Sequence, residues 1–243
     1  MSSKFNKMKV NTISAIVCQI ITVVYGMILP AFYLRYYGSE VNGMVASITQ
    51  FLGLITFCEA GIGAIIQTAL YKPLSQKNEK KISEIMVAAQ HFFRSLAMLL
   101  IGYVVVLIIF YPNIIQSDYD WGFTVILILA IASGTFSQYY FGMSNQMLIN
   151  ADQKLYIQYL FQIMTLIVTA FLSVIIMYFG GSIQSVKIVS AFILLLRPLL
   201  LSRYVKKHYN IDYKVEYKKN ALPQKWNGLV HHIASVSYTH LTL

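Results

Sequence analysis

A carboxylate lies in the middle of an apolar stretch of this sequence. Glu59 occurs in the run Phe57-Cys-Glu-Ala-Gly-Ile-Gly-Ala64. A charge at the centre of a membrane-spanning helix costs about 2.5–3.5 kcal/mol, so it persists only where it faces a partner, a water-filled cavity or an interface. The small residues around Glu59 let another helix come close. Glu59 is therefore predicted to bind a proton or a cation, or to gate a substrate; the alternative is a structural Glu tied to a neighbouring helix.

Three arginines also lie in or beside apolar stretches. Arg197 is expected either to snorkel to the cytoplasmic face or to face a cavity, because little helix separates it from that end. Arg94 lies closer to the same end of its stretch and is expected to snorkel. Arg35 is expected to anchor the outer interface or to line an outer vestibule. Helix breaks are expected at proline and glycine positions, namely Pro30, Gly61, Gly63 and Pro198.

Motifs of soluble enzymes do not occur in this sequence. It contains neither the G-x-x-x-x-G-K-[ST] loop that cradles phosphates nor the G-x-S-x-G turn of hydrolases. Cysteine and histidine never occur at zinc-ligand spacing. We therefore expect neither an enzyme nor a metal or other cofactor.

The composition explains why these charges stand out. The chain has 243 residues, of which 57% are hydrophobic and 12% charged, with a formal net charge of +10. An average soluble domain has about 25% charged residues, so this chain has too few to cover a water-exposed surface. An all-α integral membrane protein is the class that remains. In such proteins Lys and Arg mark cytoplasmic loops, so the positive charge does not indicate nucleic-acid binding.

Six stretches meet or approach the roughly 20 apolar residues that a helix needs to cross a bilayer. Their side chains are apolar all round rather than alternating, which favours helices over a β-barrel. Most of the tyrosines and tryptophans near their ends, including Tyr139 and Tyr140, are expected in interfacial belts. The predicted helices cover residues 13–34, 43–70, 92–111, 121–148, 156–179 and 183–201.

The basic residues alternate between the connecting segments. With a cytoplasmic N-terminus, 15 of the 19 Lys and Arg residues fall in inside segments, while the outside loops hold only Arg35 and Lys187. This bias places both termini in the cytoplasm. The basic segment after the last stretch is either amphipathic, lying on anionic headgroups, or a solvated linker.

Several short motifs carry a resemblance to a known family. In order they are Gly38-Ser-Glu-Val-Asn-Gly43, Glu59-Ala-Gly-Ile-Gly63, Leu70-Tyr-Lys-Pro-Leu74, Gln138-Tyr-Tyr-Phe-Gly142, Ala151-Asp-Gln-Lys154 and Leu196-Arg-Pro-Leu-Leu200. Their order and spacing resemble bacterial polysaccharide-biosynthesis proteins, the lipid-linked oligosaccharide flippases of the multidrug/oligosaccharidyl-lipid/polysaccharide exporter superfamily.

The resemblance implies two helical lobes that face each other across a cavity and alternate in access. It implies that the substrate is an undecaprenyl-pyrophosphate-linked glycan, which crosses the bacterial cytoplasmic membrane. Transport would be coupled to a proton or a cation. Glycan polymerases or glycosyltransferases would be the protein partners. Such a pyrophosphate needs cations in a wet cavity, while its polyprenyl tail can stay in lipid. This sequence offers Glu59, Arg35, Arg94 and Arg197 as candidates for substrate or ion contacts.

Members of that family usually have about twice as many helices as this chain. We therefore expect one N-terminal lobe in residues 1–201, a basic inter-lobe linker in 202–228, and the truncated start of a seventh helix in 229–243, with an aberrant tail after residue 234. Two other functions remain open. One is a multidrug cation antiporter of the same superfamily, and the other is a non-transporting membrane scaffold for glycan assembly.

Overall fold

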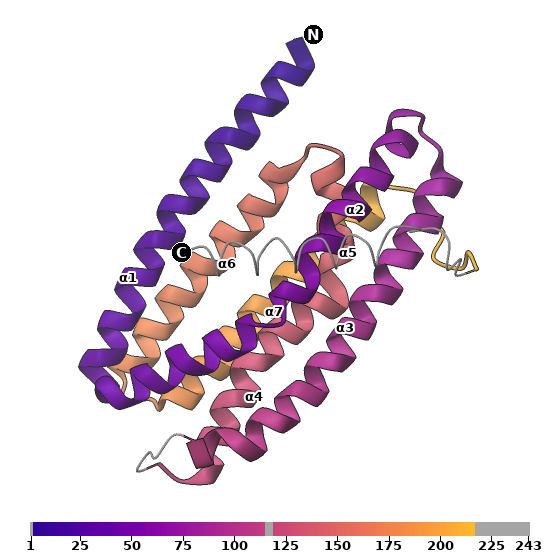
Figure 1. Cartoon of the computed structure of the whole chain (residues 1–243). Helices are drawn as coiled ribbons and strands as arrows, with labels where there is room; N and C mark the ends of the chain where they lie inside the picture. Colours follow the sequence, from indigo (N-terminus) through magenta and orange to yellow (C-terminus); the bar gives the residue numbers. More distant parts are fainter. Residues whose placement is uncertain (1, 115–118, 217–243) are drawn as a thin grey trace, which may run out of the picture.

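The protein folds as a bundle of long helices (Figure 1). The structure is a computed structural model that describes residues 2–114 and 119–216. These residues contain helices and turns but no strand. The elements are α1 (Ser2–Gly53), α2 (Thr56–Ser75), α3 (Glu79–Ile114), α4 (Trp121–Ser137), the π-helical turn η1 (Gln138–Gly142), α5 (Met143–Ala151), α6 (Leu155–Tyr178) and α7 (Ile183–His208).

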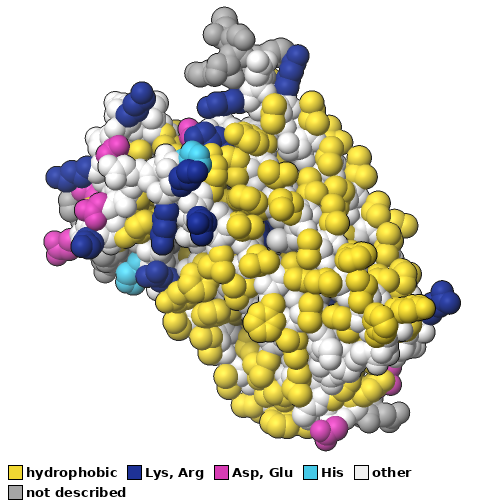
Figure 2. Space-filling view, turned by 180° about the vertical axis from the view of Figure 1, so that it is seen from behind, with side chains coloured by type: hydrophobic (Ala, Val, Ile, Leu, Met, Phe, Trp, Pro, Cys, Tyr) yellow, Lys and Arg dark blue, Asp and Glu magenta, His cyan; other side chains and the backbone are white. Residues whose placement is uncertain are grey.

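Five helical stretches in the described part of the chain are long and apolar enough to cross a membrane. Much of their outer surface consists of exposed large aliphatic and aromatic side chains, and Figure 2 shows this apolar surface over most of one face. Lipid solvates such a surface and water does not. The length and composition of these helices therefore indicate a multi-pass membrane protein. The five stretches are Asn6–Gly53, Glu79–Pro112, Trp121–Ala151, Leu155–Tyr178 and Ile183–His208.

The chain turns sharply inside α1, at Gly38. This residue has φ 83° and ψ 175°, a non-helical conformation, and it lies in a region of backbone space that is essentially restricted to glycine. In Figure 1 the first half of α1 descends from the N-terminus, and the chain then runs back across the bundle towards α2. The expected helices 13–34 and 43–70 are thus separated by a corner at one residue. The second of them is also interrupted, by a turn at Leu54 and Ile55.

Other helix boundaries differ from those predicted. The expected helix 92–111 begins 13 residues earlier, at Glu79, because residues 79–91 bury Ile82, Ile85 and Met86 on one face. The expected helix 183–201 continues to His208, so the segment predicted as a linker begins in helical form. The prediction of 156–179 is confirmed to within one residue at each end.

None of the four expected helix breaks interrupts a helix. Pro30 and Pro198 lie inside α1 and α7, and the glycines Gly61 and Gly63 lie inside α2. A β-carbon on Gly63 would lie 3.3 Å from the sulfur of Met147, so this glycine allows α5 to pack closely on α2. The interruptions lie instead at Gly38, at residues 54–55 and in η1, where the chain leaves α-helical geometry.

The helices pack in a simple order. The first half of α1 lies against α6, α6 against α7, and α7 against α4. The segment after the Gly38 corner packs on α3, where the Tyr103 hydroxyl donates to the Phe51 carbonyl at 2.9 Å and the Tyr111 hydroxyl bonds Ser47. The buried core lies mainly among α2, α3, α5 and the second half of α1.

One end of the bundle holds the start of α1, the turns at 76–78 and 152–154, and the stretch 203–216. The Asn11 amide donates to the Gln153 carbonyl at 2.8 Å, which fixes the start of α1 beside the α5–α6 turn. The Tyr209 hydroxyl donates to Asp152 at 2.6 Å, and Lys154 pairs with the same carboxylate at 2.7 Å. Burial and the hydrogen bond to Asp152 raise the pKa of Tyr209, which therefore stays a protonated donor. We call this the basic end.

The opposite end holds the Gly38 corner and the α6–α7 turn. Here the Tyr37 hydroxyl donates to the Gly181 carbonyl at 2.7 Å. The ammonium of Lys187 lies 3.2 Å from the Tyr33 hydroxyl and 4.5 Å from that ring's centre. Most of the Lys and Arg in view in Figure 2 gather at the basic end. The connections that the sequence predicts on one side of a membrane thus do lie at one end of the fold.

Candidate functional site

The carboxylate of Glu59 is held by a tyrosine from another part of the chain. The Tyr139 hydroxyl donates a hydrogen bond of 2.8 Å to Oε2 of Glu59. Tyr139 is 3% exposed, whereas Glu59 is only half-buried. The rigid ring thus fixes one carboxylate oxygen of α2 against the core, and the half-burial leaves the group in reach of the surface. A hydrogen bond to a charged acceptor contributes more than one between neutral groups.

The tyrosine belongs to η1, the turn of π-helix between α4 and α5. A π turn widens the helix by one residue and occurs often at functional sites. Here the widening coincides with a close helix contact, because a β-carbon on Gly142 would lie 2.9 Å from Cβ of Pro198 on α7. The Gln138 amide donates to Gln146 at 2.8 Å across the turn. Contacts from α2, α5 and α7 therefore hold η1 in place.

Arg94 of α3 reaches the same turn. Its guanidinium lies 5.1 Å from the centre of the Tyr140 ring, a cation–π contact, and the side chain is exposed. Phe136 stacks on the same ring at 5.5 Å. Adjacent tyrosines of η1 thus contact the two oppositely charged residues, Tyr139 towards Glu59 and Tyr140 towards Arg94. We call these four residues the η1 cluster.

The other two predicted arginines lie elsewhere. Arg35 is exposed near the Gly38 corner, at the end of the bundle opposite the basic end. Arg197 is half-buried on α7, in the half of that helix nearer the basic end. Neither arginine forms an ion pair with a carboxylate in the described part of the chain. The four charged candidates from the sequence therefore do not converge on one site; among them, Glu59 and Arg94 contact the same element, η1.

The segment from residue 39 to residue 75, which carries Glu59, has an outer surface of mainly small and polar side chains. Among its described side chains, the large apolar exposed ones are limited to Phe51, Leu54 and Tyr71. By contrast, the first half of α1 exposes a dozen large apolar side chains. We call this surface the small-polar face. It is made of Ser39, Gly43, Ala46, Thr49, Gln50, Thr56, Ala64 and Thr68.

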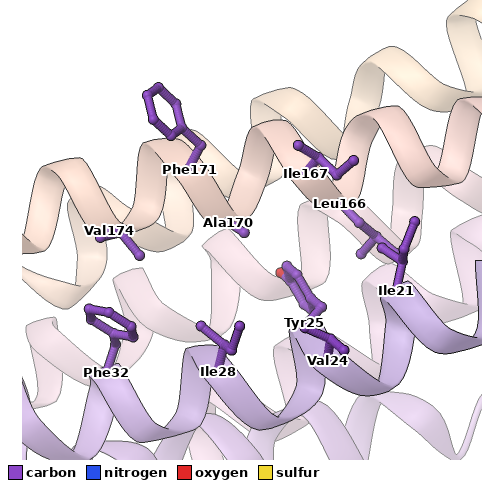
Figure 3. Close-up of a pocket in the computed structure, with 10 residues that line it drawn as sticks. All are labelled: Ile21, Val24, Tyr25, Ile28, Phe32, Leu166, Ile167, Ala170, Phe171 and Val174. Atoms are coloured by element: carbon purple, nitrogen blue, oxygen red, sulfur yellow. The ribbon is translucent and has the colours of Figure 1, made fainter.

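A groove on the other side of the Gly38 corner has a different chemistry. This groove, of about 430 Å³, runs between α1 and α6, and Figure 3 shows the side chains that line it. Its lining is aliphatic or aromatic throughout, and Tyr25 carries its one side-chain polar atom. It suits hydrocarbon and offers no partner for an anion. The lining residues are Ile21, Val24, Tyr25, Ile28, Phe32, Leu166, Ile167, Ala170, Phe171 and Val174.

A metal site is not evident in the described residues, since no three His, Cys, Asp or Glu side chains there come together. The polar groups of the η1 cluster instead suit a proton, a monovalent cation or an anionic headgroup. The carboxylate of Glu59 can accept a proton or pair with a cation, and the guanidinium of Arg94 can pair with a phosphate.

Sequence reasoning missed the two tyrosines of this cluster. Tyr139 and Tyr140 are predicted as residues of an interfacial belt, but Tyr139 is buried and bonds a carboxylate from another helix. The sequence feature that could have indicated these tyrosines is the run Gln138-Tyr-Tyr-Phe-Gly142, where polar and aromatic residues and a glycine interrupt an apolar stretch. That pattern marks a special position without indicating its partner.

No family model, no curated protein and no solved structure matches the chain.

Proposed function

We propose that this chain is one lobe of a membrane transporter that moves a lipid-linked, pyrophosphate-bearing oligosaccharide across the bacterial cytoplasmic membrane. In this proposal the small-polar face and Glu59 line the path of the polar headgroup. The apolar remainder of the surface faces lipid. The short motifs quoted from the sequence, which resemble the oligosaccharide flippases, support the choice of substrate class.

The observation that carries the proposal is the contrast between the small-polar face and the other outer surfaces. Lipid chains offer no hydrogen-bond partner to the side-chain amide of Gln50, so exposing that amide to hydrocarbon is costly. The hydroxyls of Thr49 and Thr68 donate to carbonyls of their own helix, and their small polar side chains give lipid little apolar surface. Small side chains also leave room for close approach by other helices. A surface of this kind in a membrane protein is best explained by a wet cavity or by a second lobe across it.

The same assignment gives the chain six passes through the membrane. The corner at Gly38 divides α1 into two antiparallel passes, and the second continues through residues 54–55 into α2. With the four other apolar stretches, this arrangement leaves every basic turn on one side. The positive-inside tendency assigns that side to the cytoplasm. The start of α1 and the end of α7 then both face the cytoplasm.

Within the lobe, the η1 cluster offers two complementary roles. Glu59 binds the coupling proton or cation, because Tyr139 fixes one of its oxygens and leaves the group half-exposed. Arg94 lies nearer the basic end of α3 and offers a guanidinium to an anionic headgroup that enters from the cytoplasm. Both residues contact η1, Glu59 through Tyr139 and Arg94 through Tyr140. A change in the charge of Glu59 therefore alters a contact of the same turn that Arg94 contacts.

The direct test is a flipping assay in proteoliposomes. This lobe, together with the second lobe that completes the cavity, is reconstituted with a fluorescent polyprenyl-pyrophosphate disaccharide. Transfer of the lipid to the other leaflet is followed by loss of its protection from a membrane-impermeant quencher. We expect transfer above that of protein-free vesicles. Transfer equal to that of empty vesicles, with the protein correctly inserted, would refute a flippase.

Glu59 also fits the alternative of a multidrug cation antiporter, because a half-buried carboxylate can bind an organic cation. The same vesicles separate the two: uptake of a fluorescent lipophilic cation driven by an imposed proton gradient, without lipid transfer, would favour the antiporter. If neither substrate moves while glycan-synthesis enzymes co-purify with the chain, the scaffold function is favoured.

A further inference from the structure

A second surface with distinct chemistry lies on the outer side of α7, near the basic end. It is a shallow groove of about 390 Å³, lined by leucines at one end and by polar and cationic side chains at the other. It contains neither Glu59 nor any residue of the η1 cluster. The lining consists of Leu196, Leu199, Leu200, Ser202, Arg203 and Lys206.

The order of these residues along the helix fits a lipid molecule. Leu196, Leu199 and Leu200 are 49%, 41% and 36% exposed, so they present apolar surface to the bilayer. Arg203 and Lys206 follow within one to two helical turns, about 5–9 Å further along the axis. The helix thus passes from hydrocarbon-facing leucines to cations over the depth at which a phospholipid passes from acyl chain to phosphate.

The cations of the groove are available to a ligand. Arg203 and Lys206 are both exposed, and neither has a carboxylate within ion-pair distance in the described part of the chain. A guanidinium binds a phosphate through two parallel hydrogen bonds, and an ammonium adds a point charge. The hydroxyl of Ser202 supplies a further donor at the same level. A net positive, phosphate-binding end next to an apolar floor is complementary to an anionic amphiphile.

We propose that this groove binds an anionic phospholipid of the surrounding membrane, with its phosphate on Arg203 and Lys206 and one acyl chain along the three leucines. A zwitterionic phospholipid fits less well, because its choline or ethanolamine group brings a positive charge to a site that already has two, Arg203 and Lys206. The bound lipid anchors the end of α7 at the headgroup level. This inference requires only that the chain lies in a membrane, so it stands independently of the transported substrate.

The test uses the purified full chain in a mild neutral detergent. Thermal unfolding is followed while phosphatidylglycerol, or phosphatidylcholine with the same acyl chains, is added in increasing amounts. We expect phosphatidylglycerol to raise the unfolding temperature in a saturable manner, and phosphatidylcholine to have a much smaller effect. Native mass spectrometry of the same samples counts the phosphatidylglycerol molecules that stay bound.

Two matched double variants locate the effect. Arg203→Gln with Lys206→Gln should weaken the apparent affinity for phosphatidylglycerol by about tenfold or more. Lys77→Gln with Lys80→Gln removes the same charge from exposed positions at the same end of the molecule and should leave the affinity unchanged. Unfolding temperatures without lipid check that both variants fold.

Three results would overturn the proposal. An equal loss in both double variants would mean diffuse attraction to a basic surface. An equal response to phosphatidylcholine would mean that the apolar floor alone binds. A shift of the same size with glycerol phosphate in place of the lipid would mean an anion site without a role for the leucines.

Discussion

The first half of α1 and the segment from residue 39 to residue 75 are neighbours in sequence, yet their outer surfaces have opposite chemistry. The first half, before Gly38, exposes large side chains such as Ile20, Val23 and Met27 over its length. The segment after Gly38 exposes mostly alanine, glycine, serine, threonine and glutamine, and it carries Glu59. Both are predominantly helical and both are predicted to cross the bilayer, so secondary structure does not explain the difference.

The contrast indicates that the two surfaces meet different surroundings. A helix in contact with lipid loses nothing by exposing branched aliphatic side chains, since hydrocarbon solvates them. A helix that faces water or another protein surface in the membrane can keep hydroxyl and amide groups, because those groups find hydrogen-bond partners there. The glycine corner lets the chain pass from one surrounding to the other within a single residue.

The largest effect is expected from the carboxylate of the second region. Glu59→Gln keeps the shape of the side chain but removes its charge and its ability to bind a proton or cation. We expect transport in the proteoliposome assay to fall to the level of empty vesicles, while the amount of protein in the membrane stays normal. Wild-type transport by this variant would show that Glu59 is structural.

A control variant tests the tyrosine beside it. Tyr139→Phe removes the hydroxyl that donates to Glu59 and keeps the packed ring, so transport should be reduced but not abolished. If Tyr139→Phe alone abolishes transport, the hydroxyl has a role of its own rather than that of holding the carboxylate.

Adding bulk distinguishes the two surfaces directly. Leucine at both Ala46 and Ala64 fills space on the small-polar face without replacing any buried residue. We expect transport to fall by about tenfold, equivalent to about 1.4 kcal/mol in a barrier. Ala31→Leu makes the same change at an exposed position in the first half of α1 and should leave transport unchanged. Equal effects of the two changes would remove the distinction between the surfaces.

The corner at Gly38 can be tested through the free energy of unfolding. Gly38→Ala places a β-carbon on a residue with φ 83° and ψ 175°, which should cost about 1–3 kcal/mol. Gly26→Ala lies in the first region, where a β-carbon would meet nothing within 4 Å, and it should be neutral or stabilising by up to about 1 kcal/mol. Chemical unfolding in detergent measures both. A Gly38→Ala variant as stable as the wild type would argue against a fixed corner.

The smallest effect is expected from the hydrogen bond that holds this corner to the α6–α7 turn. Tyr37→Phe removes the donor to the Gly181 carbonyl and should destabilise the fold by about 0.5–1.5 kcal/mol. Tyr36→Phe is the adjacent control, since Tyr36 is exposed and stacks on Phe32 through its ring, which phenylalanine retains. Equal unfolding curves for the two variants would mean that the Tyr37 bond adds nothing to stability.

Helix boundaries predicted from the sequence are most accurate where an apolar run alone defines the helix. The apolar stretch predicted at 156–179 is found at Leu155–Tyr178, because a bilayer-length apolar run has few alternatives to a single helix. The prediction for 92–111 falls short, since the amphipathic turns after Glu79 carry charge on one face and are not recognised by hydropathy alone. Pro30, expected at a break, lies inside α1, and the non-helical residue of that element is Gly38.

The sequence by itself determined that this is a helical membrane protein, that its basic turns lie together, and that Glu59 needs a special environment. These properties follow from the cost of placing charge in hydrocarbon, a cost that each residue carries wherever its helix lies. Only the tertiary structure decided that the partner is Tyr139, that Arg94 shares the same π turn, and that Arg35 and Arg197 lie apart. The physical reason is that these contacts join residues up to 80 positions apart in the chain, and which helices meet depends on packing that no local pattern records.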